Sequence, residues 1–487
     1  MSILAIDAGT TGVTVLVVND RGEITSRGYT EFEQHFPKPG WVEHDPEQIW
    51  QATLRASRQA LNSSQNIEAI GISNQRETLV LWDRETLIAP CNAIVWQDRR
   101  TSDIVQELKE LGLETKIRDK TGLGLDPYFT STKLLWLQRN EPAIWANVVS
   151  GKTVIGTVDS YLVARLTNGR SHITDASNAS RTQLCNLETA TWDDELLELF
   201  NVPKTALATI VPNYGHLAET DPHEFLGVEA KITGIAGDQQ CALFGQAAFE
   251  EGDSKCTYGT GAFLLTNTGD KRISSKHGLL TTIAWQAPNG EITYALEGSV
   301  FVAGSAVQWL RDGLKIIKES KDVESLANQV SDSGGVVFIP ALTGLGAPWW
   351  NPDVRGTIFG ITRGTTDAHI ARATLEAVAF QVTDLVRAME QDLGKPINTL
   401  RVDGGMSQNN LLLQLQSDSL GQNVERGKVT ETTALGAAYL AGLGAGIFAN
   451  LQSLGGIWEL DRKFTSEEKS TLSSDSWHQA VKASENY

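Results

Sequence analysis

Two segments of this sequence, far apart in the chain, each place a turn of small residues between two apolar runs. Residues 3–19 read ILAIDAGTTGVTVLVVN, and residues 254–269 read SKCTYGTGAFLLTNTG. The alternation of the first segment continues to about residue 30, which predicts a β-meander rather than a βαβ unit. A further apolar run near residue 400 ends in Asp-Gly-Gly, within LRVDGGMSQNN. These segments indicate a weak internal repeat, although Asp-Gly after a strand is also an ordinary turn signal.

The length of the chain turns this repeat into a prediction of domain organisation. Single hydrophobic cores stop growing at about 250–300 residues, whereas this chain has 487 residues. Apolar residues at helical spacing in 46–61 and 100–111 add helices to the strands of the first half. We therefore expect a mixed α/β protein with two domains, at 1–247 and 248–487, and a cleft between them.

Two segments near the C-terminus are read differently. Residues 435–449, LGAAYLAGLGAGIFA, are apolar but shorter than the ~20 residues of a membrane span, which predicts a packed helix. The stretch from about residue 462 to the end is polar, so we expect it to be peripheral and assign it no chemistry.

Composition and charge exclude several classes of partner. The chain is 41% hydrophobic and 21% charged, as soluble globular proteins are. Its formal net charge of −18 opposes binding to nucleic acid or to anionic membranes, so an anionic ligand must be held by local groups. No basic region followed by an apolar segment opens the chain, and the four cysteines form no C-x-x-C pair. We expect a cytoplasmic protein with free thiols, without signal peptide, zinc site or disulfides.

Three segments are candidates for a phosphate-binding loop. Residues 146–153, ANVVSGKT, resemble a Walker A loop, but a helical pattern precedes them and a strand pattern follows, which is the reverse of a true P-loop. In the opening turn, Gly9 permits a tight bend, Thr10 and Thr11 offer hydroxyls, and Asp7 can hold Mg²⁺ through water. The turn in 257–263, TYGTGAF, matches it, so two such turns could hold a polyphosphate across a cleft.

Longer motifs identify a family. They are DAGTT (7–11), YFTSTKLLWLQRN (128–140), GIAGDQQCALFGQ (234–246), TYGTGAF (257–263) and GTIFGITRGTTDAHIARATLE (356–376). Together they resemble the FGGY carbohydrate kinases, which share the actin-like ATPase fold. The resemblance runs from residue 1 to about 460 and implies two actin-like, ribonuclease H-like α/β domains with an interdomain catalytic cleft.

Further segments resemble the members of that family that act on glycerol. They are EFEQHFPKPGWVEHDPEQIW (31–50), SNQRET (73–78), NAIVWQDRRT (92–101) and LGAPWWNPDVRG (345–356). The resemblance implies ATP-dependent, Mg²⁺-assisted phosphorylation of glycerol to sn-glycerol 3-phosphate. The implied polyol contacts are Arg76, Glu77, Trp96, Tyr128, Asp238, Gln239 and Phe263. The implied nucleotide contacts are Thr10, Thr11, Thr260, Gly304, Gln308, Gly405 and Asn409.

The residue types suit this chemistry. Carboxylates and amides can bind the hydroxyls of a triol while Trp96 and Phe263 cover its carbon atoms. Asp238 is the expected general base, and Asp7 and Asp238 are the expected metal ligands. Taken alone, Asp238 is more typical of a helix N-cap and the aromatic residues are more typical of a core. The agreement along the whole chain favours the site.

Three departures from the family pattern leave alternatives open. The first turn continues with Gly12, Val13 and Thr14 where the pattern has Ser-Ser-Arg, so a cationic phosphate contact is missing. Glu229 and Pro212 replace an Arg that helps bind fructose 1,6-bisphosphate and a phosphorylated His, and we expect neither form of regulation. The alternatives are a family kinase for another polyol or ketose, or an inactive nucleotide-binding sensor. A homodimer or homotetramer is possible.

Overall fold

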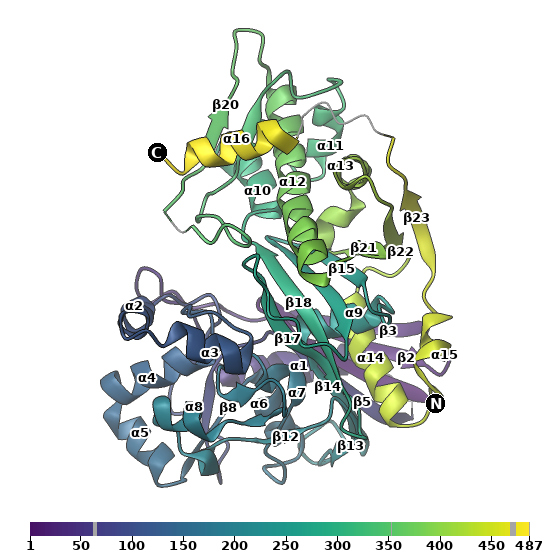
Figure 1. Cartoon of the computed structure of the whole chain (residues 1–487). Coiled ribbons are helices and arrows are strands. Elements are labelled where there is room, and N and C mark those ends of the chain that lie inside the picture. Colours follow the sequence, from purple (N-terminus) through teal and green to yellow (C-terminus); the bar gives the residue numbers. More distant parts are fainter. Residues whose placement is uncertain (62–65, 352, 468–473, 487) are drawn as a thin grey trace.

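The chain forms two large mixed β-sheets, one from each half (Figure 1). The computed structural model describes residues 1–61, 66–351, 353–467 and 474–486. The first sheet has the order β13-β14-β5-β1-β2-β3, formed by Tyr214–Glu219, Lys231–Gly237, Ile67–Asn74, Ser2–Ala8, Gly12–Asn19 and Ile24–Glu31. The second has the order β17-β18-β16-β15-β21-β22-β23, formed by Leu280–Gln286, Ile292–Val300, Ala262–Gly269, Asp253–Tyr258, Thr399–Asp403, Val424–Gly427 and Leu460–Phe464.

One topology occurs in both sheets. β1, β2 and β3 form an antiparallel meander, and β5 and β14 follow in parallel on the other side of β1. In the second sheet β15, β16 and β18 are antiparallel, and β21 and β22 follow in parallel beside β15. The predicted meander and the second strand–turn–strand segment are therefore confirmed. The run near residue 400 is β21, which corresponds to β5 rather than to the opening strand.

Helices surround the two sheets. The first half contains α1 (Pro46–Ala60), α2 (Ser102–Glu110), α3 (Glu114–Thr121), α4 (Thr130–Asn140), α5 (Pro142–Val149), α6 (Val158–Leu166), α7 (Ala176–Ala179) and α8 (Asp194–Leu199). The second contains α10 (Gly304–Asp312), α11 (Asp322–Ala327), α12 (Asp367–Leu393), α13 (Asn410–Leu420), α15 (Leu451–Gly455) and α16 (Ser474–Ser484). The helices expected from spacing are α1 and α2.

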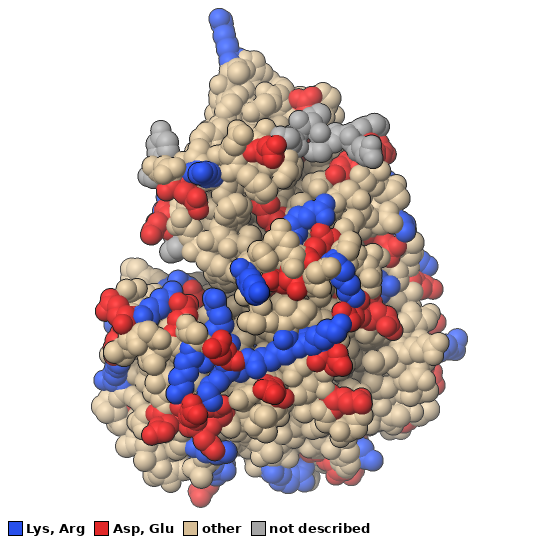
Figure 2. Space-filling model, viewed as in Figure 1, with Lys and Arg blue, Asp and Glu red and all other residues tan. Residues whose placement is uncertain are grey.

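On the face shown in Figure 2, acidic and basic side chains are interspersed, and a notch separates two lobes at the left of the view.

Short strands complete the two lobes. They are β4 (Glu43–His44), β6 (Val80–Asp83), β7 (Ala93–Ile94), β8 (Thr153–Gly156), β9 (Ile173–Asp175), β10 (Cys185–Asn186), β11 (Thr191–Trp192), β12 (Thr209–Val211), β19 (Val337–Ile339) and β20 (Thr357–Phe359). The segment that resembles a Walker A loop joins the end of α5 to β8, so it is the expected helix-to-strand turn. Its Lys152 is largely exposed and lies 3.9 Å from Asp83.

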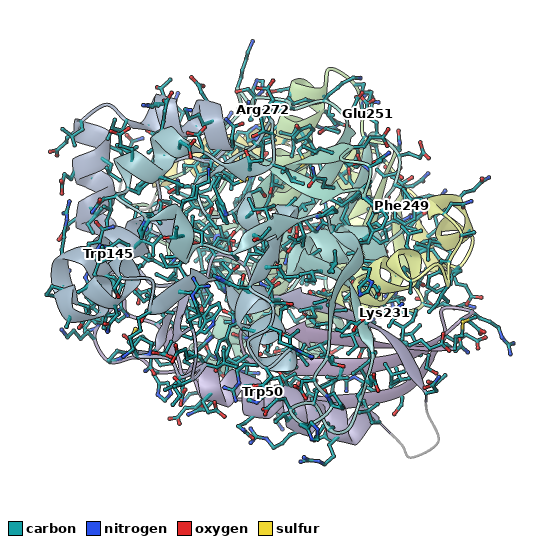
Figure 3. The ribbon with its side chains drawn as sticks, turned by 90° about the horizontal axis from the view of Figure 1, so that it is seen from below. Trp50, Trp145, Lys231, Phe249, Glu251 and Arg272 are labelled. Atoms are coloured by element: carbon teal, nitrogen blue, oxygen red, sulfur yellow. The ribbon has the colours of Figure 1, made fainter. Side chains whose placement is uncertain are left out.

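Two helices, α9 (Asp238–Gly245) and α14 (Thr432–Gly444), share one apolar cluster with both sheets. The cluster contains Ile3, Ala5, Leu16 and Val18 from the first sheet, Leu265, Ala284, Trp285 and Ala295 from the second, and Leu243, Phe244, Leu435 and Leu440 from the helices. Phe249, labelled in Figure 3, places its ring 4.9 Å from that of Phe244 and 6.2 Å from that of Trp285. The core is thus continuous from one sheet to the other, and the packed helix predicted at 435–449 is confirmed as α14.

Glycines allow the backbones in this shared core to approach closely. A Cβ atom at Gly436 would lie 1.8 Å from the carbonyl oxygen of Cys241 in α9, and one at Gly245 would lie 2.0 Å from that of Thr432. A Cβ at Gly71 in β5 would lie 2.1 Å from the carbonyl oxygen of Ala437. No other residue type fits these positions without moving a helix, since neighbouring backbone cannot yield as a side chain can.

Most described residues of the C-terminal stretch are exposed, as a peripheral segment would be, but a few of its side chains are part of the core. β23 is the edge strand of the second sheet, and Phe464 at its end is buried. Trp477 of α16 is also buried, stacks on Phe380 of α12 at 5.6 Å and donates a hydrogen bond to Asp384 at 2.8 Å. Few apolar residues spaced by one helical turn are enough to dock a short helix, and the polar composition obscured them. Residues 468–473 of this stretch lie outside the described residues.

Two other expectations also have an outcome in the structure. All the cysteines are free thiols, and Cys185, Cys241 and Cys256 are buried. Across the described residues, no helix has both the length and the apolar character needed to cross a bilayer.

We predict that Gly436→Ala destabilises the protein by about 1–3 kcal/mol, the usual range for overpacking. In a helix without such a contact, alanine is favoured over glycine by about 1 kcal/mol. A loss of stability in Gly436→Ala would therefore come from the steric clash with the Cys241 carbonyl. Gly455→Ala is the control, because Gly455 is exposed at the end of α15 and an added Cβ meets nothing within 4 Å. Urea unfolding of the three proteins measures the difference, and a Gly436→Ala protein as stable as wild type would contradict the close packing.

Candidate active site

The first phosphate turn lies between β1 and β2. Asp7 is near the end of β1, and the Gly9 amide closes the turn by donating to the Gly12 carbonyl at 3.0 Å. The Thr10 hydroxyl accepts a hydrogen bond from the Trp96 indole at 2.9 Å, while Thr11 is exposed. The turn is therefore connected directly to a residue expected to cover the polyol.

The second turn lies between β15 and β16 and supports the start of α10. The Gly259 amide donates to Gly261 at 2.8 Å, and the Ala303 and Gly304 amides donate to Thr260 and Gly259 at 2.9 and 3.0 Å. A Cβ at Gly304 would lie 2.5 Å from the Gly259 carbonyl oxygen, so this contact requires glycine. Thr260 and Gly304 are thus brought together.

The segment expected beside the adenosine follows β21. Gly404 has φ of +85°, and a Cβ there would lie 2.5 Å from the carbonyl oxygen of Tyr258, just before the second turn. Gly405 is exposed next to it. Asn409 caps α13, because its side-chain oxygen accepts from the Leu412 amide at 2.9 Å, which leaves its NH₂ group for another contact.

Thr11 lies in the first turn beside Thr10, and Gln308 lies in α10, which begins at Gly304. Both are exposed, and among the described residues neither side chain makes a hydrogen bond to another expected site residue. Their assignment to the nucleotide stays a prediction.

Three aromatic rings from different parts of the chain meet beside the first turn. The Trp96 ring centroid lies 5.5 Å from that of Tyr128 and 6.3 Å from that of Phe263, both edge to face. Phe263 belongs to β16, so the second sheet contributes to this apolar wall. Edge-to-face contacts of this kind fix the ring orientations.

A buried network of charges lies beside the aromatic wall. The Arg76 guanidinium pairs with Glu297 through two hydrogen bonds, of 2.6 and 2.9 Å, and its Nε lies 3.3 Å from Asp238. Arg181 donates to Glu77 at 2.6 Å and to Glu297 at 2.9 Å. These five side chains come from both halves of the chain, and all but Asp238 are almost fully buried.

This network shifts the carboxyl pKa values in opposite directions. Burial raises the pKa of Glu297, but Arg181 and Arg76 outweigh it and hold the value at about 2. For Asp238, burial prevails over Arg76 and Lys255, so its pKa is raised above the ordinary value. The Asp238 side chain remains 28% exposed at the start of α9, where it can meet a ligand. One carboxylate is therefore locked in an ion pair, and the other is available as a base.

The backbone around Glu77 and Tyr128 is held by a buried lysine. Glu77 has φ of +60°, which is rare for a residue with a side chain, and its carbonyl accepts from Thr130 at 3.1 Å. Lys133 donates to the carbonyls of Tyr128 and Phe129 at 2.6 and 3.2 Å. Burial lowers the pKa of Lys133 to about 7.

The residues present fit a magnesium ion between Asp7 and Asp238. The Asp7 Oδ1 atom is buried and has no hydrogen-bond partner among the described residues. Burial and the charge of Asp238 raise the pKa of Asp7 to about 7, as expected where a cation would relieve two neighbouring carboxylates. The described residues contain no group of three or more His, Cys, Asp and Glu side chains that could hold a metal. Magnesium suits such a site, since it takes one or two carboxylates and completes its shell with water and phosphate.

Arg181 and Glu297 were missed by the sequence reasoning. Glu297 lies in β18 within the apolar run YALEGSV, and an acidic residue in a buried strand was the available signal. Arg181 follows the short helix α7, and nothing in its neighbourhood indicates that it reaches Glu77, 104 residues away.

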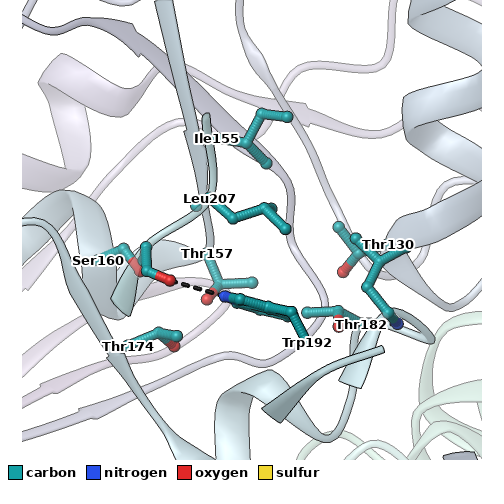
Figure 4. A pocket seen from close by; sticks show the side chains of 11 residues that line it. Thr130, Ile155, Thr157, Ser160, Thr174, Thr182, Trp192 and Leu207 are labelled. Carbon is teal, nitrogen blue, oxygen red and sulfur yellow. Dashed lines mark hydrogen bonds between the residues drawn. The ribbon is translucent and has the colours of Figure 1, made fainter. Parts of the chain in front are cut away.

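The small cavity in Figure 4 lies next to the site, because Thr130, which donates to the Glu77 carbonyl, is one of its lining residues. It has a volume of about 20 Å³ and is lined by Thr130, Ile155, Gly156, Thr157, Ser160, Thr174, Thr182, Leu184, Trp192, Leu207 and Ala208. The dashed line marks the Trp192 indole donating to the Ala208 carbonyl at 2.8 Å. Such a volume is about the size of a single water molecule, and the Ser160 hydroxyl that lines it has no hydrogen-bond partner among the described residues.

The repeated strand order defines the class of fold: two actin-like, ribonuclease H-like domains, each with a turn of small residues after its first strand. Residues 2–245 match the N-terminal domain of the FGGY family of carbohydrate kinases, and residues 254–445 match its C-terminal domain. The chain belongs to the FGGY family of carbohydrate kinases. The division at residue 247 itself stays a prediction.

Several relatives are similar over nearly the whole chain. A protein of Geobacillus sp. (strain WCH70) named glycerol kinase is 51% identical over 99% of this chain and 98% of its own. One of Bdellovibrio bacteriovorus with the same name is 53% identical over 95% and 94%. The crystal structure of Plasmodium falciparum glycerol kinase with ADP superposes with a TM-score of 0.93 at 37% identity, covering 99% of this chain and 98% of that one.

We predict that Glu297→Gln destabilises the protein by about 3–5 kcal/mol at neutral pH, because two buried guanidinium groups lose the carboxylate that they share. The folded-state pKa of about 2 lies below the ordinary 4.5, so this carboxylate stabilises the fold above pH 4.5 and loses its effect as the pH falls towards 2. The difference from wild type should shrink over that interval.

The control for this prediction is Glu459→Gln. Glu459 pairs with Lys428 on the surface at 2.9 Å with 66% of its side chain exposed, so its loss should cost less than about 1 kcal/mol. Denaturant unfolding at several pH values compares the variants. Equal, small losses for both would show that the buried pair does not stabilise the fold.

Proposed function

We propose that this protein transfers the γ-phosphoryl group of ATP to glycerol and releases sn-glycerol 3-phosphate and ADP. Relatives named glycerol kinase, about half identical over almost their entire length, support glycerol as the substrate. The ADP named with the Plasmodium falciparum structure supports an adenine nucleotide as the second ligand.

The observation that carries the proposal is the contact between Arg76 and Asp238 beside the aromatic wall. Arg76 is held rigidly by Glu297, so it can orient both Asp238 and a substrate hydroxyl. Asp238 accepts the proton of the attacking primary hydroxyl as that oxygen bonds to the γ-phosphorus and the bond to the β-phosphate oxygen breaks. Glu77 and Gln239 bind the remaining hydroxyls, and Trp96, Tyr128 and Phe263 cover the carbon atoms and exclude water.

The nucleotide is assigned to the two turns. Thr10 and Thr11 face the phosphates from the first turn, and Thr260 and Gly304 from the second. Gln308, Gly405 and Asn409 are assigned to the adenosine. Mg²⁺, held through Asp7 and Asp238, would offset negative charge on the phosphates. The missing cation at Thr14 leaves backbone amides and hydroxyls to hold the phosphate chain.

A family kinase for another polyol or ketose is the second candidate, since the altered first turn leaves donor and substrate preference open. A coupled assay of ADP release across a panel of polyols and ketoses separates the two. A cytoplasmic location, expected from the free cysteines, and a homodimer or homotetramer belong to the same proposal.

We predict that Asp238→Asn lowers turnover by at least about 100-fold, since general-base assistance is commonly worth about 10²–10⁴-fold. Nucleotide affinity, assigned to residues on the turns, should change little. Asp194→Asn is the control because its side chain is 82% exposed. Steady-state kinetics with glycerol and calorimetric nucleotide binding provide the measurements. A folded Asp238→Asn protein that turns over within a few-fold of wild type would overturn the assignment and leave Asp238 as only a helix cap.

We predict a different defect for Asp7→Asn. This change weakens the site for the metal and spares the base, so activity should recover in part as Mg²⁺ is raised. Titrating MgCl₂ at fixed ATP in wild type, Asp7→Asn and Asp238→Asn tests this. A defect in Asp7→Asn that is independent of Mg²⁺ would argue against its role as a metal ligand.

A further inference from the structure

Lys255 is a buried cation at the junction of the two sheets. It lies in β15, is fully buried, and its ammonium group donates hydrogen bonds to the side-chain oxygen of Gln239 and to the Thr257 hydroxyl, the latter at 3.0 Å. Gln239 follows Asp238 at the start of α9, whereas Thr257 lies two residues further along β15, just before the second turn. The lysine therefore connects a residue assigned to the polyol with the strand that leads to the phosphate turn.

The charge of Lys255 determines which end of the Gln239 amide faces it. An ammonium group has three donors and no acceptor, so only the carbonyl oxygen of the amide can face it. The NH₂ group of Gln239 must then point elsewhere, and no hydrogen bond reaches it among the described residues. Gln239 is partly exposed at the start of the helix, so its NH₂ group is available to a ligand beside Asp238.

Burial of Lys255 strengthens its hold on the orientation of the Gln239 amide. Burial lowers the pKa of Lys255, while the charges of Asp403 and Asp238 oppose that effect. A buried ammonium group that loses a partner pays a large desolvation penalty, so Lys255 holds the Gln239 oxygen strongly. The carboxylates of Asp403 and Asp238 favour the charged ammonium form of Lys255, which is the form that donates hydrogen bonds.

We propose that Lys255 is a positioning residue that fixes the Gln239 amide with its NH₂ group towards the substrate, where it donates to a hydroxyl oxygen. This inference rests on the proposed function and deepens it. The polyol is then bound by two unlike neighbours, since Asp238 accepts from a hydroxyl and Gln239 donates to one. A polyol hydroxyl can do both, which suits a pocket that presents an acceptor and a donor side by side.

A double-mutant cycle tests whether Lys255 acts through Gln239. The proteins are wild type, Lys255→Met, Gln239→Leu and the double variant, and the measured quantities are kcat and KM for glycerol and KM for ATP. Lys255→Met should raise KM for glycerol by about 10- to 100-fold, the value of a hydrogen bond that involves a charged group, with less change in kcat and in KM for ATP. In the Gln239→Leu background, the same substitution should have almost no further effect on glycerol.

Two further variants guard the interpretation. Lys271→Met removes a lysine that is 61% exposed after β16 and should leave all constants unchanged. Lys255→Arg keeps a buried donor and should restore at least part of the glycerol affinity. If Lys255→Met does not fold, Lys255→Gln, which is polar but carries no charge, takes its place in the cycle. Thermal unfolding of every variant identifies a loss that comes from the fold.

The possible outcomes are distinct. Effects of Lys255→Met and Gln239→Leu that multiply would show that the lysine supports only the fold, and would overturn the inference. An unchanged KM for glycerol in Lys255→Met would do the same while wild-type turnover leaves the proposed function standing. A wild-type protein that neither phosphorylates nor binds glycerol would overturn the proposed function and, with it, this inference.

Discussion

The buried pair of Arg76 and Glu297 is the interaction on which the arrangement of the site depends. Arg76 follows β5 of the first sheet and Glu297 lies in β18 of the second, and their two hydrogen bonds join the sheets at the point where Asp238 begins α9. Isolated buried charges are costly, so each partner requires the other to be in place. Asp238 is therefore correctly oriented only when both halves of the chain are in place.

The shared core makes this placement rigid. α9 and α14 contact residues of both sheets, and glycines bring the backbone of α14 against α9 and β5. Backbone contacts cannot adjust as side chains do, so the start of α9 has a fixed position relative to the first sheet. Asp238 and Gln239 are both at this end of α9. The steric fit of helices thus determines where the charges of the site are placed.

Features that depend on neighbours along the chain could be predicted from the sequence. The meander at the N-terminus, the two small-residue turns, α1, α2 and α14 all follow from local apolar patterns and glycines. Arg181, Glu297 and Lys255 could not be found in this way, because their partners are far away in the chain and only the tertiary fold brings them together. The docking of the C-terminal helix was missed because only Trp477, Ala480 and Val481 of an otherwise polar stretch enter the core. Asn409 was expected only as a ligand contact, yet it also caps α13.

The charges of the site also explain how so acidic a chain can hold a polyphosphate. Glu297 and Glu77 are neutralised by Arg76 and Arg181, so those guanidinium groups are not available to phosphate. The Lys255 ammonium group already donates hydrogen bonds to Gln239 and Thr257. In the proposed assignment, the phosphates are held by the amides and hydroxyls of the two turns, which carry no net charge, and by a metal ion, which the carboxylates of Asp7 and Asp238 fit. With no cation at Thr14, this assignment makes phosphate binding depend on the geometry of the turns and on the metal, and therefore on the distance that the shared core sets between the two sheets.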